Sequence, residues 1–346
     1  MPSAVSSAAR ALEPLATSIL GSGPALALAR GWRRRGYAVL CYHRLREPTA
    51  FDDPTFVISP ERFREHVEVL SRLGQVVGLD DLAASGTPSD RPRVVITFDD
   101  GYREVLDHAL PVLAEYGCPS VLYCCSEVVA GERAFWWDRL ESSLRAAPPG
   151  PVDLSARDGS ELRLELDGDA GRAATLARLR EHCTLQPDPR TAGEHLLEQL
   201  PAAELPDDLY LDVEGLARAE SLGAEIGSHS RRHSRLGALP ASELDEELRE
   251  SRAALDAWTS RSVRSVAYPH GDPSSVNEVV FHAARTAGYE TGFTIRPALA
   301  RSGGDPFSIP RITMYATDTA RRCAAKGLGA LPGVYDRVYR RTQGPR

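Results

Sequence analysis

Carboxylate and imidazole side chains occur in this sequence at spacings that could build a catalytic metal site. In the stretch "RVVITFDDGYRE" a β-branched run ends in Asp99 and Asp100, and the stretch "EIGSHSRRH" carries His229 and His233. Adjacent aspartates repel each other and are costly to bury unless a positive charge lies nearby. Two imidazoles and one carboxylate suit zinc or a similar divalent ion that keeps a position open for water. The pattern therefore predicts that one aspartate of the pair and both histidines hold a metal ion.

The catalytic base must come from outside the histidine motif. Ser230, Arg231 and Arg232 separate the two histidines, so the glutamate of the H-E-x-x-H proteases is absent. The spacing of four residues lets both imidazoles face one side if the chain turns helically between them. With Asp100 as the ligand, Asp99 is the economical candidate for the base, because strand side chains alternate and its carboxylate points to the other face.

A repeated α/β pattern supplies the elements that would position these groups. Three segments combine a helix-period stretch, a glycine and a β-rich run, and the glycines fit the left-handed turn at a helix end: Gly117, Gly223 and Gly288. With "YAVLCYH", "RVVITF", "RSVAYP" and "FSIPRITM", the count reaches about seven strands. Helices are expected near residues 60–73, 104–116, 213–222, 241–258 and 275–287. Closure into a barrel would bring the carboxyl ends of the strands to one face.

The barrel pattern runs over residues 37–320 with one interruption. Between about residues 130 and 212 the sequence has a proline- and glycine-rich loop, a short hairpin and two expected helices, which indicates an insertion on one loop. Residues 1–36 are expected to form an N-terminal helical segment, and residues 321–346 a C-terminal helical tail.

Composition and charge argue against several classes of partner. The chain has 346 residues, and its 41 basic and 48 acidic side chains give a formal net charge of -7, which argues against a nucleic-acid binder. The six cysteines include no C-x-x-C pair, and several lie in apolar runs, as expected for buried thiols in a reducing compartment. The N-terminal apolar stretch precedes its arginines and is short for a membrane span, so we predict a cytoplasmic protein with at most peripheral membrane contact.

Several sequence pieces, taken in order, resemble the polysaccharide deacetylase family, also called the NodB-homology or carbohydrate esterase family 4 group. They are "VLCYHRL", "TFDDGY", "GSHSRRH", "AYPHGD", "GYETGFTI" and "IPRITM". The resemblance implies an α/β fold: a distorted (β/α)7 TIM-like barrel with a helical and hairpin insertion. It also implies a divalent metal, most commonly Zn²⁺, and removal of N-acetyl groups from amino sugars. Carried over to this chain, it makes Asp100, His229 and His233 the metal ligands, Asp99 the base, and the Tyr102 backbone amide part of the oxyanion site.

Two positions depart from the family pattern. The family commonly has an arginine where this chain has Ala267, and a histidine acid in an L-x-H pattern where this chain has Ile309, Pro310 and Arg311. An arginine cannot act as a general acid at neutral pH. We hypothesise that Arg311 replaces the missing arginine by pairing with Asp99 and keeping it ionised. His43 or His270 would then supply the proton for the leaving amine.

Residues near these motifs are expected to contact the substrate. This set consists of polar and aromatic side chains at strand ends and at the start of the insertion: His43, Tyr268, Pro269, His270, Trp137 and Asp138. A plainer interpretation stays open for the insertion, in which Phe135, Trp136 and Trp137 only anchor it to the barrel. Likewise, Asp138 would only cap a helix.

The sequence thus predicts a metal-dependent hydrolase that removes N-acetyl groups from an amino sugar, a polysaccharide or a glycoconjugate intermediate, with an N-acetylated carbohydrate as its partner. A catalytically silent carbohydrate-binding barrel is the alternative, because the acid histidine is missing. A metal-dependent glycosyltransferase with an aspartate pair is a weaker third interpretation, because such a site needs no H-x-x-x-H motif.

Overall fold

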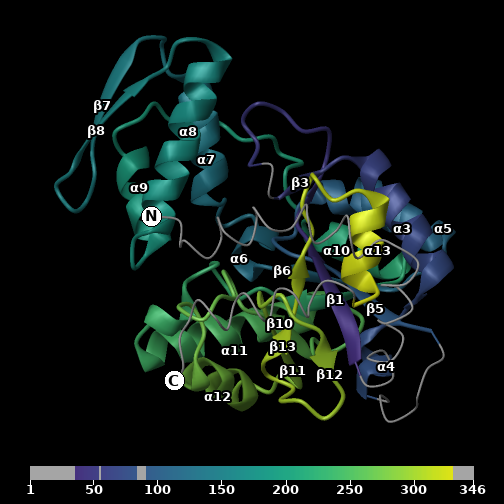
Figure 1. The fold of residues 1–346 in the computed structure, drawn as a ribbon. Coiled ribbons are helices and arrows are strands. Elements are labelled where there is room, and N and C mark those ends of the chain that lie inside the picture. Colours follow the sequence, from purple (N-terminus) through teal and green to yellow (C-terminus); the bar gives the residue numbers. More distant parts are fainter. Residues whose placement is uncertain (1–35, 54–55, 84–90, 330–346) are drawn as a thin grey trace, which may run out of the picture.

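The computed structural model describes residues 36–53, 56–83 and 91–329 (Figure 1). The predicted N-terminal helical segment, apart from Gly36, lies outside these residues, and so does the predicted tail after residue 329. Within the described ranges, no helix is both long and apolar enough to cross a bilayer. All six cysteines are buried and carry free thiols, as predicted.

Parallel strands form a barrel whose last strand closes the ring. In barrel order the strands are β1 (Gly36–Tyr42), β5 (Arg93–Phe98), β6 (Ser120–Cys124), β9 (Ala224–Ser228), β10 (Ser265–Ala267) and β11 (Thr291–Thr294). The closing segment contains β13 (Ile309–Pro310), which pairs with β11, and β14 (Ile312–Thr313), which pairs with β1. Arg311 lies between these two short strands. The predicted distorted (β/α)7 barrel is therefore confirmed.

Alternating side chains of each strand face two different cores. Val39, Val95 and Val121 lie in the cluster that fills the barrel interior, whereas Leu40 and Ile96 lie in the larger cluster between the strands and the surrounding helices. Both faces are buried, which explains why these strands are continuous apolar runs rather than alternating ones. The alternation also fixes which residues past the strand ends point toward the barrel axis.

Helices cover the outside of the barrel. They are α3 (Pro60–Leu73), α5 (Leu110–Glu115), α10 (Val213–Ser221), α11 (Ala241–Trp258), α12 (Glu278–Thr286) and α13 (Ala320–Gly327), and a π-helical turn, η2 (Val105–Ala109), precedes α5. Ser59 and Asn277 cap the first turns of α3 and α12 through their side-chain oxygens. The three predicted turn glycines all have positive φ: Gly117, Gly223 and Gly288.

Short elements complete the connections around the barrel. They are β2 (Arg44–Leu45), β3 (Val57–Ile58), β4 (Gln75–Val76), α4 (Leu79–Ala83), α6 (Ser126–Val129), η3 (Leu236–Ala238) and β12 (Ala300–Arg301). The pair β2 and β3 lies past the carboxyl end of β1, beside the site described below.

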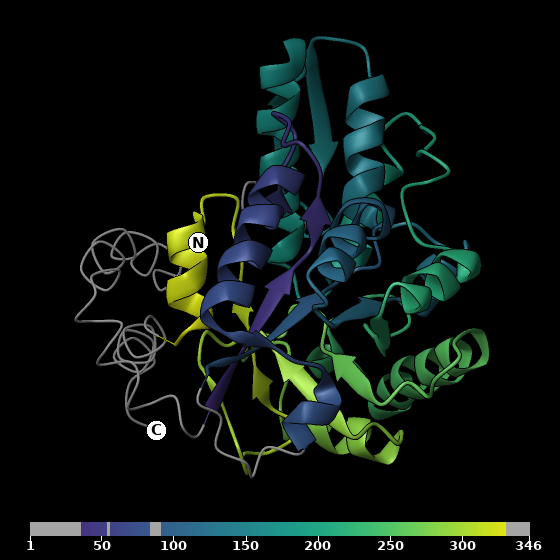
Figure 2. The same cartoon turned by 90° about the vertical axis from the view of Figure 1, so that its right-hand side faces the viewer.

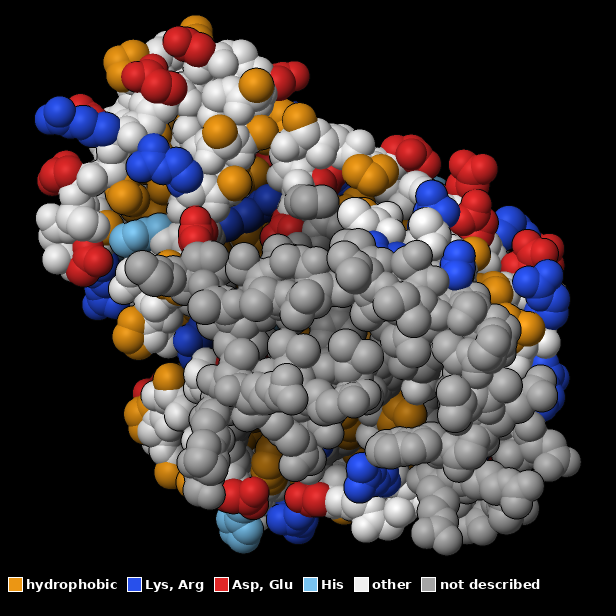
Figure 3. Space-filling view, in the orientation of Figure 1, with side chains coloured by type: hydrophobic (Ala, Val, Ile, Leu, Met, Phe, Trp, Pro, Cys, Tyr) orange, Lys and Arg blue, Asp and Glu red, His pale blue; other side chains and the backbone are white. Residues whose placement is uncertain are grey.

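The region predicted as an insertion has a hydrophobic core of its own. It contains α7 (Trp136–Ala146), the hairpin β7 (Pro151–Ser155) and β8 (Glu161–Glu165), α8 (Gly168–Thr184) and α9 (Pro189–Leu197). Its buried leucines form a cluster with Trp136 that is separate from the barrel clusters. In Figure 2 this region stands above the barrel and the purple arrow of β1 points toward it. Figure 3 shows acidic and basic side chains mixed over its outer surface. A helix at the start of the insertion was expected only through the capping interpretation of Asp138, and that interpretation is wrong in detail, because Phe135 is the N-cap of α7 and Asp138 lies in its first turn.

Candidate metal centre and catalytic pocket

The side-chain alternation of β5 and of the closing segment brings chemistry-bearing groups to the axis of the barrel. On β5 and beyond it, Thr97 and Asp99 continue the inward-facing series of Val95. Arg311 follows Ile309 in the same way on the closing segment, and its side chain has no exposed surface. The carboxyl end of the barrel therefore presents a carboxylate and a guanidinium side by side.

Asp100, His229 and His233 converge on one point. The Asp100 Oδ1 atom lies 3.5 Å from the Nε2 atom of each histidine, and one potential ligand atom from each residue lies within 4.8 Å of the others. Asp100 Oδ1 is buried and has no hydrogen-bond partner. Burial and the charge of Asp99 raise the pKa of Asp100 well above its usual range. A divalent cation would supply the missing partner and the missing positive charge, so these three residues fit a metal ion.

The neighbouring backbone orients the His229 ring. Its Nδ1 atom lies 2.7 Å from the carbonyl oxygen of Ala267, which can only accept, so Nδ1 carries the proton and Nε2 turns a lone pair toward Asp100. Burial lowers the pKa of both His229 and His233, which favours the neutral imidazoles that bind metals. Ala267, one of the two departures from the family pattern, thus acts through its backbone.

Left-handed backbone is concentrated at this site. Within the described residues, the non-glycine positions with positive φ are Asp100 at 74°, Ser230 at 62°, His233 at 59° and His270 at 60°. Such conformations are unfavourable for residues with a Cβ and persist only where surrounding contacts impose them. Gly101, at φ 78°, allows the turn after the strand, and a Cβ there would lie 3.2 Å from Cys124 Sγ.

Arg311 and Asp99 form the ion pair that the sequence hypothesis proposed. Two hydrogen bonds join them, from Nη1 to Oδ1 at 2.6 Å and from Nη2 to Oδ2 at 2.7 Å. Burial alone would raise the pKa of Asp99, but the charge and hydrogen bonds of Arg311 outweigh it and hold the pKa below the usual range. Asp99 is therefore a carboxylate, and its Oδ2 atom lies 3.9 Å from His229 Nε2.

A second cluster, Cys41, His43 and Asp99, also has ligand atoms within 4.8 Å of one another. It is a poor metal site because Arg311 already binds both oxygens of Asp99 and burial raises the pKa of the Cys41 thiol. His43 Nε2 lies 4.0 Å from Asp99 Oδ2, and its Nδ1 has no hydrogen-bond partner. At this distance His43 and Asp99 are neighbours but are not hydrogen-bonded.

Aromatic rings flank the metal centre. Trp137 stacks on Phe135 with ring centroids 4.4 Å apart, and its ring centroid lies 5.0 Å from that of His233. The ring centroid of His270 lies 5.0 Å from that of His233. Near His43, Phe56 is 40% exposed and its ring centroid lies 4.8 Å from the imidazole. Partly exposed rings thus surround the candidate centre: Trp137 and His270 lie beside His233, and Phe56 lies beside His43.

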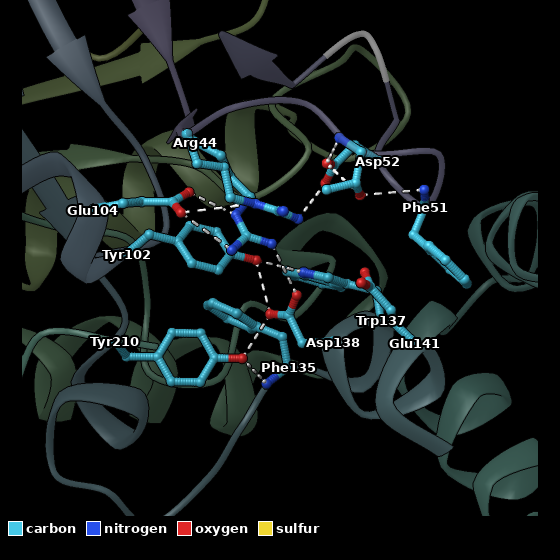
Figure 4. A network of polar contacts seen from close by, with 12 residues as sticks. Arg44, Phe51, Asp52, Tyr102, Glu104, Phe135, Trp137, Asp138, Glu141 and Tyr210 are labelled. Carbon is cyan, nitrogen blue, oxygen red and sulfur yellow. Dashed lines mark hydrogen bonds and ion pairs between the residues drawn. The ribbon is translucent and has the colours of Figure 1, made fainter. Parts of the chain in front are cut away.

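A buried polar network ties the insertion to the barrel loop after β5 (Figure 4). Asp138 Oδ2 accepts hydrogen bonds from the hydroxyls of Tyr102 at 2.8 Å and Tyr210 at 2.6 Å. The Trp137 indole donates to the Tyr102 hydroxyl at 2.8 Å. The Arg44 guanidinium lies 4.2 Å from the centre of the Tyr102 ring and 3.5 Å from Asp138 Oδ1. Asp138 is therefore a buried hub whose oxygens are both occupied by protein groups.

The Tyr102 loop is also fixed by its backbone. A β-bridge pairs Tyr102 with Tyr210, through hydrogen bonds from Arg103 N to Leu209 O and from Leu211 N to Gly101 O. Among the hydrogen bonds of the described residues, none is donated by the Tyr102 amide. That amide is therefore available to an external acceptor.

Tyr268 and Pro269 lie deeper than the other predicted substrate contacts. The Tyr268 ring has no exposed surface, packs on Phe281 and donates its hydroxyl hydrogen to the Phe307 carbonyl at 3.1 Å. Pro269 is buried beside it. The partly exposed predicted contacts are His43, Trp137 and His270.

Sequence reasoning did not single out several residues of this site, among them Phe56, Tyr210 and Glu247. For Glu247 a signal exists, because it falls on the buried face of α11 with Leu244, Leu248, Ser251 and Leu255. A charged residue at a helical position that the pattern assigns to the core indicates a buried partner. Phe56 and Tyr210 lie in loops, and no periodicity marks them.

Comparisons with known proteins agree with this geometry. The family described as "Polysaccharide deacetylase" matches residues 86–152 and 190–292. A search of curated protein sequences gave no match. Among solved structures, the fold is similar to that of the Streptococcus pyogenes deacetylase PplD in complex with acetate, at a TM-score of 0.57 and 14% identity, covering 84% of this chain and 98% of that one.

Two further solved structures share the fold. IcaB from Ammonifex degensii has a TM-score of 0.55 at 18% identity, with 85% of this chain and 98% of that chain covered. BC0361, a polysaccharide deacetylase from Bacillus cereus, has a TM-score of 0.54 at 15% identity, with 84% and 69% covered. At these identities the likeness concerns the fold.

Proposed function

Because the chain belongs to the polysaccharide deacetylase family, we propose that it hydrolyses the N-acetyl group of an amino sugar in a metal-dependent reaction. The observation that carries this proposal is the pairing of two carboxylates with opposite surroundings. Asp100 faces two imidazoles and has an oxygen without a partner, whereas Asp99 is held as a carboxylate by Arg311. Neighbouring groups with divergent environments are typical of sites that divide metal binding and proton transfer between them.

The proposed metal ligands are Asp100, His229 and His233, and the proposed ion is Zn²⁺, which binds imidazole and carboxylate ligands readily. When bound, such an ion polarises the amide carbonyl and makes water more acidic. The remaining work belongs to side chains and backbone groups of the chain.

Asp99 is the proposed base. Its carboxylate takes one proton from the attacking water, whose oxygen bonds to the acetyl carbon. Arg311 keeps the carboxylate ionised and fixes its orientation, because both guanidinium nitrogens bind it. The negative charge that develops on the acetyl oxygen is received by the Tyr102 amide, which has no acceptor in the described protein.

Breaking the carbon–nitrogen bond requires a proton on the leaving amine. We place His43 in this role, because its Nε2 atom lies 4.0 Å from Asp99 Oδ2, so one bridging water would let it relay the proton that Asp99 has taken from the attacking water. Burial lowers the pKa of His43 to about 4, so the imidazole holds that proton only briefly. The products are acetate and the free amine.

The substrate is expected to rest against the partly exposed rings of the pocket. Trp137 lies beside His233 and Phe56 beside His43, so the two aromatic residues border different sides of the reacting centre. Aromatic faces of this kind bind the apolar faces of sugar rings. The cytoplasmic location remains a prediction, because the N-terminal residues on which it depends lie outside the described ranges.

The test is a screen for acetate release from N-acetylated sugars, run as free monosaccharides, nucleotide-linked sugars and oligomers. We expect acetate and free amine in equal amounts from at least one class, loss of activity with a chelator, and recovery on addition of Zn²⁺. Asp99→Asn serves as the control for contaminating activity. Carbohydrate binding with full metal content and no acetate release from any class would contradict the proposal and favour the catalytically silent barrel.

A further inference from the structure

The loop between His229 and His233 has an unusual backbone. Ser230 and His233 both adopt left-handed conformations, at φ 62° and 59°. Between them, Arg231 and Arg232 direct their amide hydrogens away from the metal centre, toward helix α11. Something outside the loop must therefore hold this conformation, since it is unfavourable by itself.

Two helices bind this loop. The amides of Ser126 and Glu127 in helix α6 donate to the carbonyl oxygens of Ser230 and Arg231, and Glu247 of helix α11 accepts from the amide hydrogens on the other side of the loop. The Glu247 Oε2 atom accepts hydrogen bonds from the amides of Arg231 at 3.1 Å and Arg232 at 3.0 Å. Its Oε1 atom accepts from Arg232 Nε at 2.6 Å and from the Ser234 hydroxyl at 3.0 Å. The side chain has no exposed surface. One buried carboxylate thus binds three residues of the loop, and two of them, Arg232 and Ser234, flank the candidate ligand His233.

The buried Glu247 carboxylate has both a counter-charge and a full set of hydrogen-bond donors. A buried carboxylate is tolerated when a counter-charge and enough donors surround it, and Arg232 supplies the charge while four donors fill the oxygens. A neutral side chain of the same size could not accept all four hydrogen bonds. The site therefore requires a carboxylate specifically, not merely a polar group.

Other contacts on the loop are consistent with a conformation set in advance. The Ser230 hydroxyl accepts from the His233 amide at 3.1 Å, and the Ser230 carbonyl accepts from the Ser251 hydroxyl at 2.9 Å. Ser251 is one helical turn after Glu247 on the same buried face of α11. Helix α11 thus forms hydrogen bonds with the loop from two successive turns, at Glu247 and at Ser251.

We propose that Glu247 is a positioning residue for the metal centre, which holds His233 in its ligand geometry before any ion arrives. The inference rests on the proposed metal site and deepens it, because it assigns the pre-organisation of that site to a residue that touches neither metal nor substrate. Partners of metal ligands commonly change metal affinity by about 10- to 100-fold when they are removed.

Helix α11 also provides a matched control. Glu246 and Glu250 bind the Arg231 side chain at 2.7 Å and 2.6 Å, and their side chains are 44% and 50% exposed. They carry the same charge on the same helix and contact the same loop, but they do not bind its backbone. Glu250→Gln therefore tests whether a nearby negative charge is enough.

The experiment measures binding of Zn²⁺ and Co²⁺ to the full chain for the wild type, Glu247→Gln and Glu250→Gln, at a temperature where circular dichroism shows all three folded. We expect a dissociation constant about 10- to 100-fold higher for Glu247→Gln with an altered Co²⁺ absorption spectrum, and wild-type behaviour for Glu250→Gln. Equal dissociation constants and spectra for Glu247→Gln and the wild type would overturn the inference. Absence of metal binding by the wild type would instead overturn the proposed function and the inference with it.

A second measurement needs no variant. In the metal-free wild type, the amide hydrogens of Arg231 and Arg232 should exchange with solvent slowly, because a buried carboxylate accepts both of them. If Glu247→Gln does not fold, this measurement decides the matter: protection of these two amides supports the inference, and exchange at the rate of an open loop overturns it.

Discussion

Arg311 and Asp99 are joined by two hydrogen bonds of 2.6 Å and 2.7 Å inside the barrel, and neither side chain is exposed by more than 2%. The arginine comes from the segment that closes the ring and the aspartate from the end of β5, so barrel closure itself brings them together. The pair keeps Asp99 ionised beside Asp100, whose Oδ1 atom has no hydrogen-bond partner.

Replacing Arg311 should therefore reduce activity and stability together. Arg311→Ala leaves Asp99 buried without its partner, and we expect about a 10²-fold or larger loss of kcat and a destabilisation of about 3 to 5 kcal/mol. Arg311→Lys should be intermediate, because an ammonium group cannot bind both oxygens in parallel. Kinetics and urea unfolding check both values. Arg285→Ala is the matched control, because it breaks an exposed pair with Asp305.

The pH dependence of the same variant has a definite sign. Arg311 depresses the pKa of Asp99 in the folded state, so its stabilising contribution is present above the unfolded value, about 3.9, and is lost as pH falls through the lower folded value. Without Arg311, burial raises the pKa, and the acid limb of the kcat/KM profile should move to higher pH. An unchanged limb and an unchanged rate in Arg311→Ala would refute the role of the pair.

Substrates with different leaving groups should distinguish the role of His43 from that of His270. His43→Gln should lower kcat about 10²-fold on an N-acetyl sugar, because the amine then leaves without a proton. The loss should largely disappear on p-nitrophenyl acetate, whose phenolate leaves unprotonated. His270→Gln should raise KM with a smaller change in kcat. Equal losses on both substrates in His43→Gln would contradict proton delivery by this residue.

Asp138 and Tyr210 should be coupled in stability. Tyr210→Phe removes the hydrogen bond to Asp138 and the one accepted from the Phe135 amide, and it should cost about 1 to 2 kcal/mol. Asp138→Ala leaves two tyrosine hydroxyls without their acceptor, while Arg44 keeps Glu104, and it should cost about 3 kcal/mol. In an Asp138→Ala background, Tyr210→Phe should have a smaller effect, because only the hydrogen bond from the Phe135 amide is then left to lose. Urea unfolding of the four proteins measures the cycle, and strict additivity would show that the network is not shared.

Trp137 should affect substrate binding more than chemistry. Trp137→Ala removes a partly exposed ring beside His233, and we expect KM to rise about fivefold, which corresponds to about 1 kcal/mol of stacking. Trp258→Phe, on the outer face of the barrel, is the control for loss of a tryptophan. A wild-type KM for Trp137→Ala on every active substrate would remove this ring from the binding surface.

Much of the barrel could be predicted from periodicity and turn residues. Helix α3 has the predicted bounds, and Gly117, Gly223 and Gly288 end helices as expected, because local rules decide such positions. The closure of the ring was harder to foresee in detail: β13 and β14 are two residues each and pair with different neighbours, so no single strand pattern marks Arg311 as the residue between them.

The contacts that support the site were less accessible to sequence reasoning. Asp138 and Tyr102 are 36 positions apart, and their hydrogen bond depends on how helix α7 docks on the barrel. Glu247 lies in "SELDEELRES", where several glutamates look alike until one of them is found on the buried face. Propensity and spacing carry no information about such long-range polar partners, which depend on the completed fold.

Asp100, His229 and His233 are proposed to bind one divalent ion that Asp99 does not coordinate. The most direct test is a Zn²⁺ titration, with acetate release measured in parallel, on the wild type, Asp99→Asn and Asp100→Asn. We predict one tightly bound ion in the wild type and in Asp99→Asn, strongly weakened binding in Asp100→Asn, and acetate release by the wild type only. Wild-type Zn²⁺ affinity in Asp100→Asn, or loss of the ion in Asp99→Asn, would contradict the account.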